Sequence, residues 1–143
     1  MSSITLFANI VGKTVIVDTI RESTSSIYSI LSSNPIELNT HLEIYDFENR
    51  LKIIDALLDE LKPNENKHKA LKLSLESIKK TIDKIHKNID ILNKQVVYHN
   101  TKWFKNWRQP EYNKTIKDLD ILSNKLDKNF DILLKVINIE DKI

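Results

Sequence analysis

A stripe of mostly apolar residues in the middle of the chain recurs at steps of three and four. It comprises Leu71, Leu75, Ile78, Ile82, Ile85, Ile89, Leu92, Val96, His99 and Trp103. Because an α-helix has 3.6 residues per turn, this spacing places all ten side chains on one face of a single long helix. Such a stripe is stable only when it packs against other helices. The segment therefore predicts an all-α protein whose other helices cover this stripe.

The composition leaves little material for tight β-turns or for disulfides. The 143 residues include one glycine, three prolines and no cysteine. Hairpin turns depend on glycine, whereas a chain of this length can bury a core without disulfides or metals. The absence of cysteine also excludes thiol nucleophiles and cysteine metal ligands. We expect a single domain over residues 1–143.

Three breaks divide the chain into four expected helices. These helices cover about 3–32, 35–62, 66–107 and 110–139. Asn34 and Pro35 suit the N-cap and first turn of the second helix, while Pro63 and Pro110 mark the next two breaks. Short connections between long helices favour antiparallel neighbours. The predicted fold is an antiparallel up-down-up-down four-helix bundle.

The first of these segments is ambiguous. The β-branched run from Thr14 to Val17 would suit a strand, but a lone strand would have no partner. The spacing of Ile10, Val17 and Ile20 favours a helix instead. Gly12 within it marks either close packing of another helix or a flexible point from which the first turns detach. Both interpretations of Gly12 stay open.

Charge is segregated along the chain. Residues 62–117 carry fourteen basic and five acidic side chains, whereas residues 1–61 carry four and nine. In one interpretation the basic third helix pairs with the acidic second helix. In the other, the basic residues bind an anionic surface. The candidate binding residues are Lys79, Lys80, Lys84, Lys87, Lys94, Lys102, Lys105 and Arg108.

Three large aromatic residues lie beside the last of these cations. Trp103, Phe104 and Trp107 occur within five positions. They either plug the open end of a bundle or form an interaction edge next to the basic residues. Because no base-reading motif accompanies them, nucleic acid is the least favoured partner.

No pattern typical of catalysis or of metal binding is present. Asp83 and His86 have the spacing of a di-iron motif in helical bundles, but that motif uses glutamate and needs a second pair. Neither a HExxH pair nor a glycine-rich phosphate loop occurs. We expect a protein that is not an enzyme and has no catalytic residues, no cofactor and no metal site.

The most apolar segment does not resemble a membrane span. Residues 4–20 include Asn9, Lys13 and Asp18 and fall short of the ~20 apolar residues that a spanning helix needs. No basic residue precedes the segment as in a secretory signal. We expect a cytoplasmic protein that is at most peripheral on a membrane.

The order of these features resembles a known family of cell-death bundles. An apolar first helix, the Asn34–Pro35 break, two long helices, the aromatic-basic corner and a leucine-rich last helix are similar to the amino-terminal four-helix bundle of mixed-lineage-kinase-domain-like necroptosis effectors. Plant powdery-mildew-resistance-type coiled-coil domains and fungal HeLo domains are similar in outline. The corner from Tyr98 to Arg108 also resembles a segment of uncharacterised proteins of giant DNA viruses.

The resemblance implies a bundle that self-associates and binds anionic lipid through basic patches during cell death. It would act as an effector, or as a viral decoy that co-assembles with a host bundle. We therefore expect an interaction module whose partner is another protein, a second copy or an anionic phospholipid. A purely scaffolding bundle or homodimer is the alternative, and non-specific nucleic-acid binding is the third.

Overall fold

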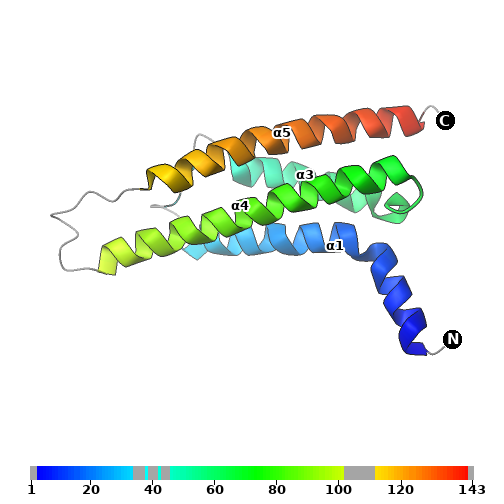
Figure 1. The fold of residues 1–143 in the computed structure, drawn as a ribbon, viewed down its shortest axis with the longest axis horizontal. Helices are drawn as coiled ribbons and strands as arrows, with labels where there is room; N and C mark the ends of the chain where they lie inside the picture. Colours follow the sequence, from blue (N-terminus) through cyan, green and yellow to red (C-terminus); the bar gives the residue numbers. More distant parts are fainter. Residues whose placement is uncertain (1–2, 34–37, 39–41, 43–45, 102–111, 142–143) are drawn as a thin grey trace.

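The computed structural model describes residues 3–33, 38, 42, 46–101 and 112–141, with side chains for 16–33, 38, 42, 46–100 and 112–139. These ranges contain four α-helices and no strand, which confirms the all-α prediction. The helices are α1 (Ser3–Ser33), α3 (Phe47–Leu61), α4 (Lys69–Thr101) and α5 (Asn113–Asp141), with a 3₁₀ turn η2 (Lys62–Asn64). Figure 1 shows them lying side by side along the long axis of the molecule.

Helix α4 is the central element. It packs against α5 on one side and against α1 on the other, and α3 packs against α1 (Figure 1). Because α1 and α5 cover α4 from two sides, the polar residues Ser74 and Thr81 next to the aliphatic stripe are also buried. The stripe therefore lies at the junction of the other helices, as its spacing requires.

The predicted stripe is buried from Leu71 to Val96, where exposed fractions range from 0 to 3%. His99 is half-buried, and Trp103 lies outside the described residues. All four helices contribute to the core around the stripe. The largest fully buried side chains include Ile20, Ile27, Leu38, Leu51, Leu58, Leu71, Leu75, Ile78, Ile82, Ile85, Ile89 and Leu92.

The predicted continuous helix over 35–62 is wrong. Helix α3 begins only at Phe47, because the preceding Asp46 has left-handed backbone angles, φ 48° and ψ 39°. No α-helix continues through such a residue, and aspartate is among the few residues that tolerate it. The Asp46 carboxylate Oδ1 accepts a hydrogen bond from Asn49 Nδ2 at 2.9 Å. The predicted cap at Asn34 and Pro35 lies outside the described residues.

The last two helices differ from their predicted bounds by a few residues. Residues 62–67 form η2 and a turn, so α4 begins at Lys69 and continues to Thr101. The predicted extension of this helix to Trp107 falls on 102–111, outside the described residues. Helix α5 begins three residues after Pro110 and ends two residues beyond the predicted end at 139.

Helix α1 confirms the choice of helix over strand for the first segment. Its backbone is helical from Ser3 to Ser33. Its first turns, however, point away from the other helices (Figure 1). No helix in the described part of the chain has an apolar stretch sufficient to cross a lipid bilayer.

Candidate interaction surface

The outer side of α4 carries a second periodic stripe, opposite the buried one. It contains Lys80, Lys84, Lys87, Ile91, Lys94 and Tyr98. These residues follow at alternating steps of four and three, so they share one face of the helix. All six are exposed. Helix α4 therefore presents an aliphatic stripe to the core and a lysine-rich stripe to solvent.

The lysines of α4 differ in their partners. Lys79 Nζ lies 2.7 Å from Asp83 Oδ2, and Lys94 Nζ lies 2.9 Å from Asp90 Oδ2. Both are pairs within α4. Among the described residues, no carboxylate lies within ion-pair distance of Lys80, Lys84 or Lys87. The interpretation in which the basic helix pairs with the acidic second helix is therefore wrong for the described lysines of α4.

Helix α5 extends this surface. Asn129 Nδ2 donates a hydrogen bond to Thr81 Oγ1 at 2.6 Å, and Thr115 Oγ1 donates one to Gln95 Oε1 at 3.1 Å. These contacts fix the register of α5 against α4. Helical geometry then places one row of exposed α5 residues beside the outer stripe of α4. That row contains Ile121, Lys125, Lys128 and Ile132.

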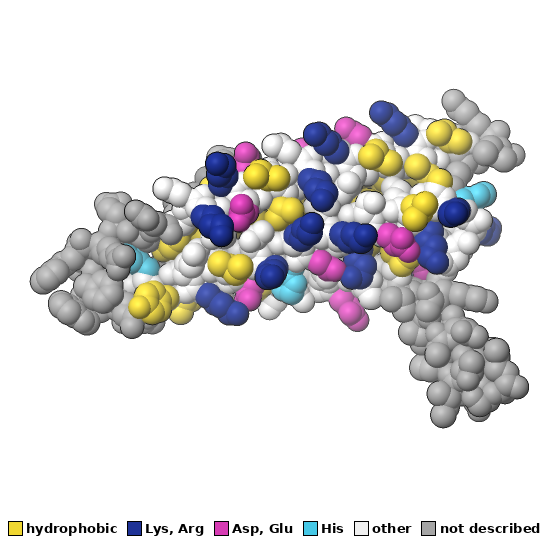
Figure 2. All heavy atoms as spheres, in the orientation of Figure 1, with side chains coloured by type: hydrophobic (Ala, Val, Ile, Leu, Met, Phe, Trp, Pro, Cys, Tyr) yellow, Lys and Arg dark blue, Asp and Glu magenta, His cyan; other side chains and the backbone are white. Residues whose placement is uncertain are grey.

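We call the combined surface the lysine–aliphatic face. It comprises Leu73, Lys80, Lys84, Lys87 and Ile91 of α4 with Ile121, Lys125, Lys128 and Ile132 of α5. The aliphatic members are well exposed: Leu73 by 52%, Ile121 by 56% and Ile132 by 53%. Figure 2 shows Lys and Arg side chains over α4 and α5, with hydrophobic side chains and also Asp and Glu side chains among them.

Of the residues predicted for binding, the structure thus brings together Lys80, Lys84 and Lys87, with Lys94 at the edge. Lys79 lies toward α1. The remaining predicted residues fall outside the described ones: Lys102, Trp103, Phe104, Lys105, Trp107 and Arg108. The sequence analysis did not identify the α5 members of the face. Ile121 and Ile132 lie outside the spacing of the other apolar residues of α5, and this could have indicated that they are exposed.

Like charges are close together on the lysine–aliphatic face. Lys80 and Lys84 are spaced i,i+4, and each like-charge pair at that spacing costs about 0.2–0.5 kcal/mol in a helix. None of these lysines, nor Lys125 and Lys128, has an ion-pair partner among the described residues. Ion pairs among the described residues therefore do not account for this cluster of cations.

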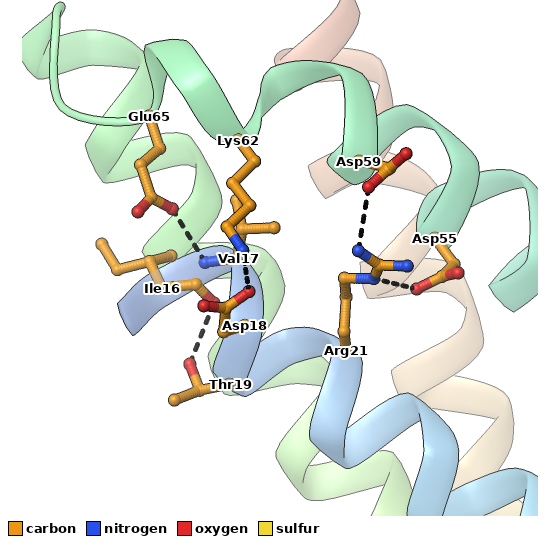
Figure 3. Close-up of polar contacts among 9 residues, drawn as sticks. All are labelled: Ile16, Val17, Asp18, Thr19, Arg21, Asp55, Asp59, Lys62 and Glu65. Atoms are coloured by element: carbon orange, nitrogen blue, oxygen red, sulfur yellow. Dashed lines mark hydrogen bonds and ion pairs between the residues drawn. The ribbon is translucent and has the colours of Figure 1, made fainter. Parts of the chain in front are cut away.

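Basic side chains between α1 and the α3–η2 segment are paired with carboxylates. Arg21 of α1 reaches Asp55 and Asp59 of α3 at 2.9 and 3.0 Å, and Lys62 lies 2.9 Å from Asp18 (Figure 3). The hydrogen bond and charge of Asp55 raise the pKa of Arg21. Partial burial, together with the charges of Asp55 and Glu48, raises the pKa of Tyr28 in α1 to about 12. Cations thus pair with carboxylates between α1 and the α3–η2 segment, whereas Lys80, Lys84 and Lys87 of α4 have no ion-pair partner among the described residues.

Asp83 joins α4 to α1. Its Oδ1 accepts a hydrogen bond from Ser23 Oγ at 2.6 Å, and its Oδ2 accepts one from Lys79 at 2.7 Å. Partial burial alone would raise the pKa of Asp83, but the hydrogen bonds from Lys79 and Ser23 outweigh it and the pKa is lowered. Both carboxylate oxygens are thus engaged, so Asp83 does not form the beginning of a metal site with His86.

The described residues include no group of three or more histidines or carboxylates that could hold a metal ion. A hollow between α3 and α5, lined by Arg50, Ile53 and Phe130 among others, has a volume of about 70 Å³. Small-molecule sites usually have ~300–1,000 Å³. A larger depression of about 690 Å³ beside Asp18 and Arg21 is open to solvent, and both of these side chains are in ion pairs.

Comparison with known proteins leaves the lysine–aliphatic face as the main guide to function. No protein-family model matches the sequence, and no curated protein or solved structure is significantly similar to it.

Proposed function

We propose that the protein is a non-enzymatic interaction module that binds an anionic phospholipid surface through its lysine–aliphatic face. In this proposal the four helices form an antiparallel up-down-up-down bundle, and the protein is cytoplasmic and peripheral on the membrane. The central position of α4 between α1 and α5 supports a bundle. The resemblance to necroptosis and HeLo bundles agrees with this role and adds self-association in cell death, as an effector or a viral decoy.

The observation that carries the proposal is the combination of unpaired lysines with exposed aliphatic side chains on one surface. Each lysine near an anionic leaflet contributes about 1 kcal/mol of attraction. Aliphatic side chains on the same surface enter the boundary between headgroups and acyl chains. Lys84 and Lys87 beside Ile91 and Ile121 provide both parts. Neither part alone would give stable binding at physiological salt.

A phospholipid surface fits this face better than nucleic acid does. Phosphate backbones attract lysine, but the exposed Ile121 and Ile132 would find no apolar partner along them. A homodimer across the same face would oppose lysines of equal charge. Scaffolding remains the alternative function, in which the lysines only keep the surface hydrated.

Charge reversal on the face tests the proposal. The double variant Lys84→Glu/Lys87→Glu should lose at least about tenfold in binding to vesicles containing phosphatidylinositol phosphate, because two attractive charges become repulsive. Its melting temperature should stay within a few degrees of wild type, since neither lysine has an ion-pair partner to lose. Vesicle co-sedimentation and thermal unfolding measure the two effects.

Lys52→Glu is the matched control. Lys52 is an exposed lysine of α3 whose partner is Glu48 on the same helix. This variant should bind vesicles nearly as well as wild type. If Lys84→Glu/Lys87→Glu left vesicle binding intact, scaffolding would be the better explanation. Binding to DNA with a steep salt dependence would favour the nucleic-acid function instead.

A further inference from the structure

Glu65, in the loop between α3 and α4, is a buried carboxylate with an exposed fraction of 2%. Its Oε2 accepts a hydrogen bond from the backbone N–H of Val17 at 3.0 Å (Figure 3). Val17 lies within α1, far from either end of the helix. A side chain 48 residues away along the chain thus enters the backbone of a continuous helix.

In an uninterrupted α-helix the N–H of Val17 would donate to the carbonyl oxygen of Lys13. The Glu65 carboxylate therefore competes with that carbonyl for the same N–H. A side chain inserted into the hydrogen-bond ladder is one of the recognised causes of a sharp helix kink. Figure 1 shows the corresponding bend, where the first turns of α1 leave the direction of the rest. The hydrogen bond between Val17 and Glu65 thus offers a cause for the bend that is independent of Gly12.

The second oxygen of the same carboxylate, Oε1, is buried and has no hydrogen-bond partner among the described residues. Burying an unpartnered polar atom is unfavourable, so the bond to Val17 stabilises an otherwise costly position. The neighbouring Lys62 Nζ reaches Asp18 at 2.9 Å. Lys62 and Glu65 therefore bind two successive residues of α1, Asp18 and Val17.

We propose that Glu65 is a latch that sets the angle between residues 3–16 and the rest of α1. In the latched state the N–H of Val17 donates to Glu65. In the released state the same N–H donates to Lys13, and α1 straightens. In each state the N–H of Val17 has one hydrogen-bond acceptor. Movement of the loop at 62–66 therefore changes the direction of residues 3–16 relative to the rest of α1. The latch acts independently of the lysine–aliphatic face.

A distance across the bend tests the latch. The chain has no native cysteine, so Thr5→Cys and Ser29→Cys introduce two spin labels at defined positions. In a straight helix these positions would be about 36 Å apart. The wild-type background should give a shorter distance by electron-spin resonance. Glu65→Ala should move the distribution toward the straight-helix value, whereas Glu60→Ala, which removes an exposed carboxylate of α3, should leave it unchanged.

Amide hydrogen exchange supplies a second measurement that does not depend on the alanine variant folding. The isosteric Glu65→Gln keeps an acceptor oxygen but loses its charge. It should hold the bend and speed exchange at the Val17 amide by about threefold or more, because charge-assisted hydrogen bonds are about twice as strong. Exchange at Ile27 should not change. Unchanged exchange at Val17 in Glu65→Gln, or a wild-type distance in a folded Glu65→Ala, would overturn the proposal.

Discussion

At the scale of single residues, Asp83 shows how one carboxylate connects two helices. It takes hydrogen bonds from Ser23 of α1 and from Lys79 of its own helix. Both bonds favour the charged form, and its pKa is therefore below the ordinary value of 3.8. A carboxylate with a lowered pKa in the folded state stabilises that state above its unfolded pKa.

Asp83→Asn should accordingly lower the free energy of unfolding by about 0.5–1 kcal/mol at pH 7, a modest loss because the side chain is partly exposed. The stabilising contribution is fully present above pH 3.8 and is lost as the pH falls through the lowered pKa of the folded protein. The difference between wild type and variant should therefore vanish in strong acid. Urea unfolding at several pH values measures it.

Asp90→Asn is the control for this prediction. Among the described residues Asp90 forms an ion pair only with Lys94, one turn further along α4. Its replacement should cost less than about 0.5 kcal/mol, because an i,i+4 pair contributes no more than that. Equal losses for Asp83→Asn and Asp90→Asn, or a difference that persisted in strong acid, would contradict a connecting role for Asp83.

At the scale of elements, α4 carries two periodic stripes with opposite roles. The inner stripe is buried from Leu71 to Val96, and the outer stripe from Lys80 to Tyr98 is exposed. Two isoleucines, Ile85 and Ile91, differ in which stripe they occupy. Ile85 is fully buried, while Ile91 is 37% exposed.

Ile85→Ala should lower the free energy of unfolding by about 2–5 kcal/mol, because it removes buried methylene groups and leaves a cavity. Ile91→Ala removes the same atoms from a partly exposed position and should cost less than about 1 kcal/mol. Chemical denaturation of both variants measures the difference. Similar losses at the two positions would mean that the stripes have been assigned to the wrong sides of the helix.

Local periodicity made much of the fold predictable. The steps of three and four from Leu71 to Val96 led to a buried stripe, and the four helical regions followed from the same rule and from the prolines. The turn at Asp46 was not predicted, because a left-handed aspartate leaves no periodic signal of its own. In the sequence, Leu38 and Leu42 do not continue the spacing of the apolar residues from Phe47 onward, which is consistent with a turn between them.

Contacts between distant residues were beyond the reach of the sequence. Glu65 and Val17 are 48 positions apart, and neither belongs to a motif that predicts their hydrogen bond. The lysines of the candidate site were selected by charge alone, although their spacing already separates Lys79, which is paired, from Lys84 and Lys87. Which lysines lack partners depends on where the carboxylates lie in three dimensions.

At the scale of the whole molecule, the cations between α1 and α3 differ in their partners from the lysines of the lysine–aliphatic face. Arg21 and Lys62 are paired with carboxylates between α1 and the α3–η2 segment, whereas Lys84, Lys87 and Lys125 lie unpaired among exposed aliphatic residues of α4 and α5. These unpaired lysines fit attraction to an anionic partner outside the protein. The central claim is that this partner is a phospholipid surface.

Co-sedimentation of the wild-type protein with neutral and anionic vesicles, each at low and at physiological salt, tests this claim most directly. We predict binding to anionic vesicles only, weakened but not abolished at physiological salt, because screening reduces the lysine attraction while the aliphatic contacts persist. An absence of binding to anionic vesicles at low salt, or equal binding to neutral ones, would contradict the claim.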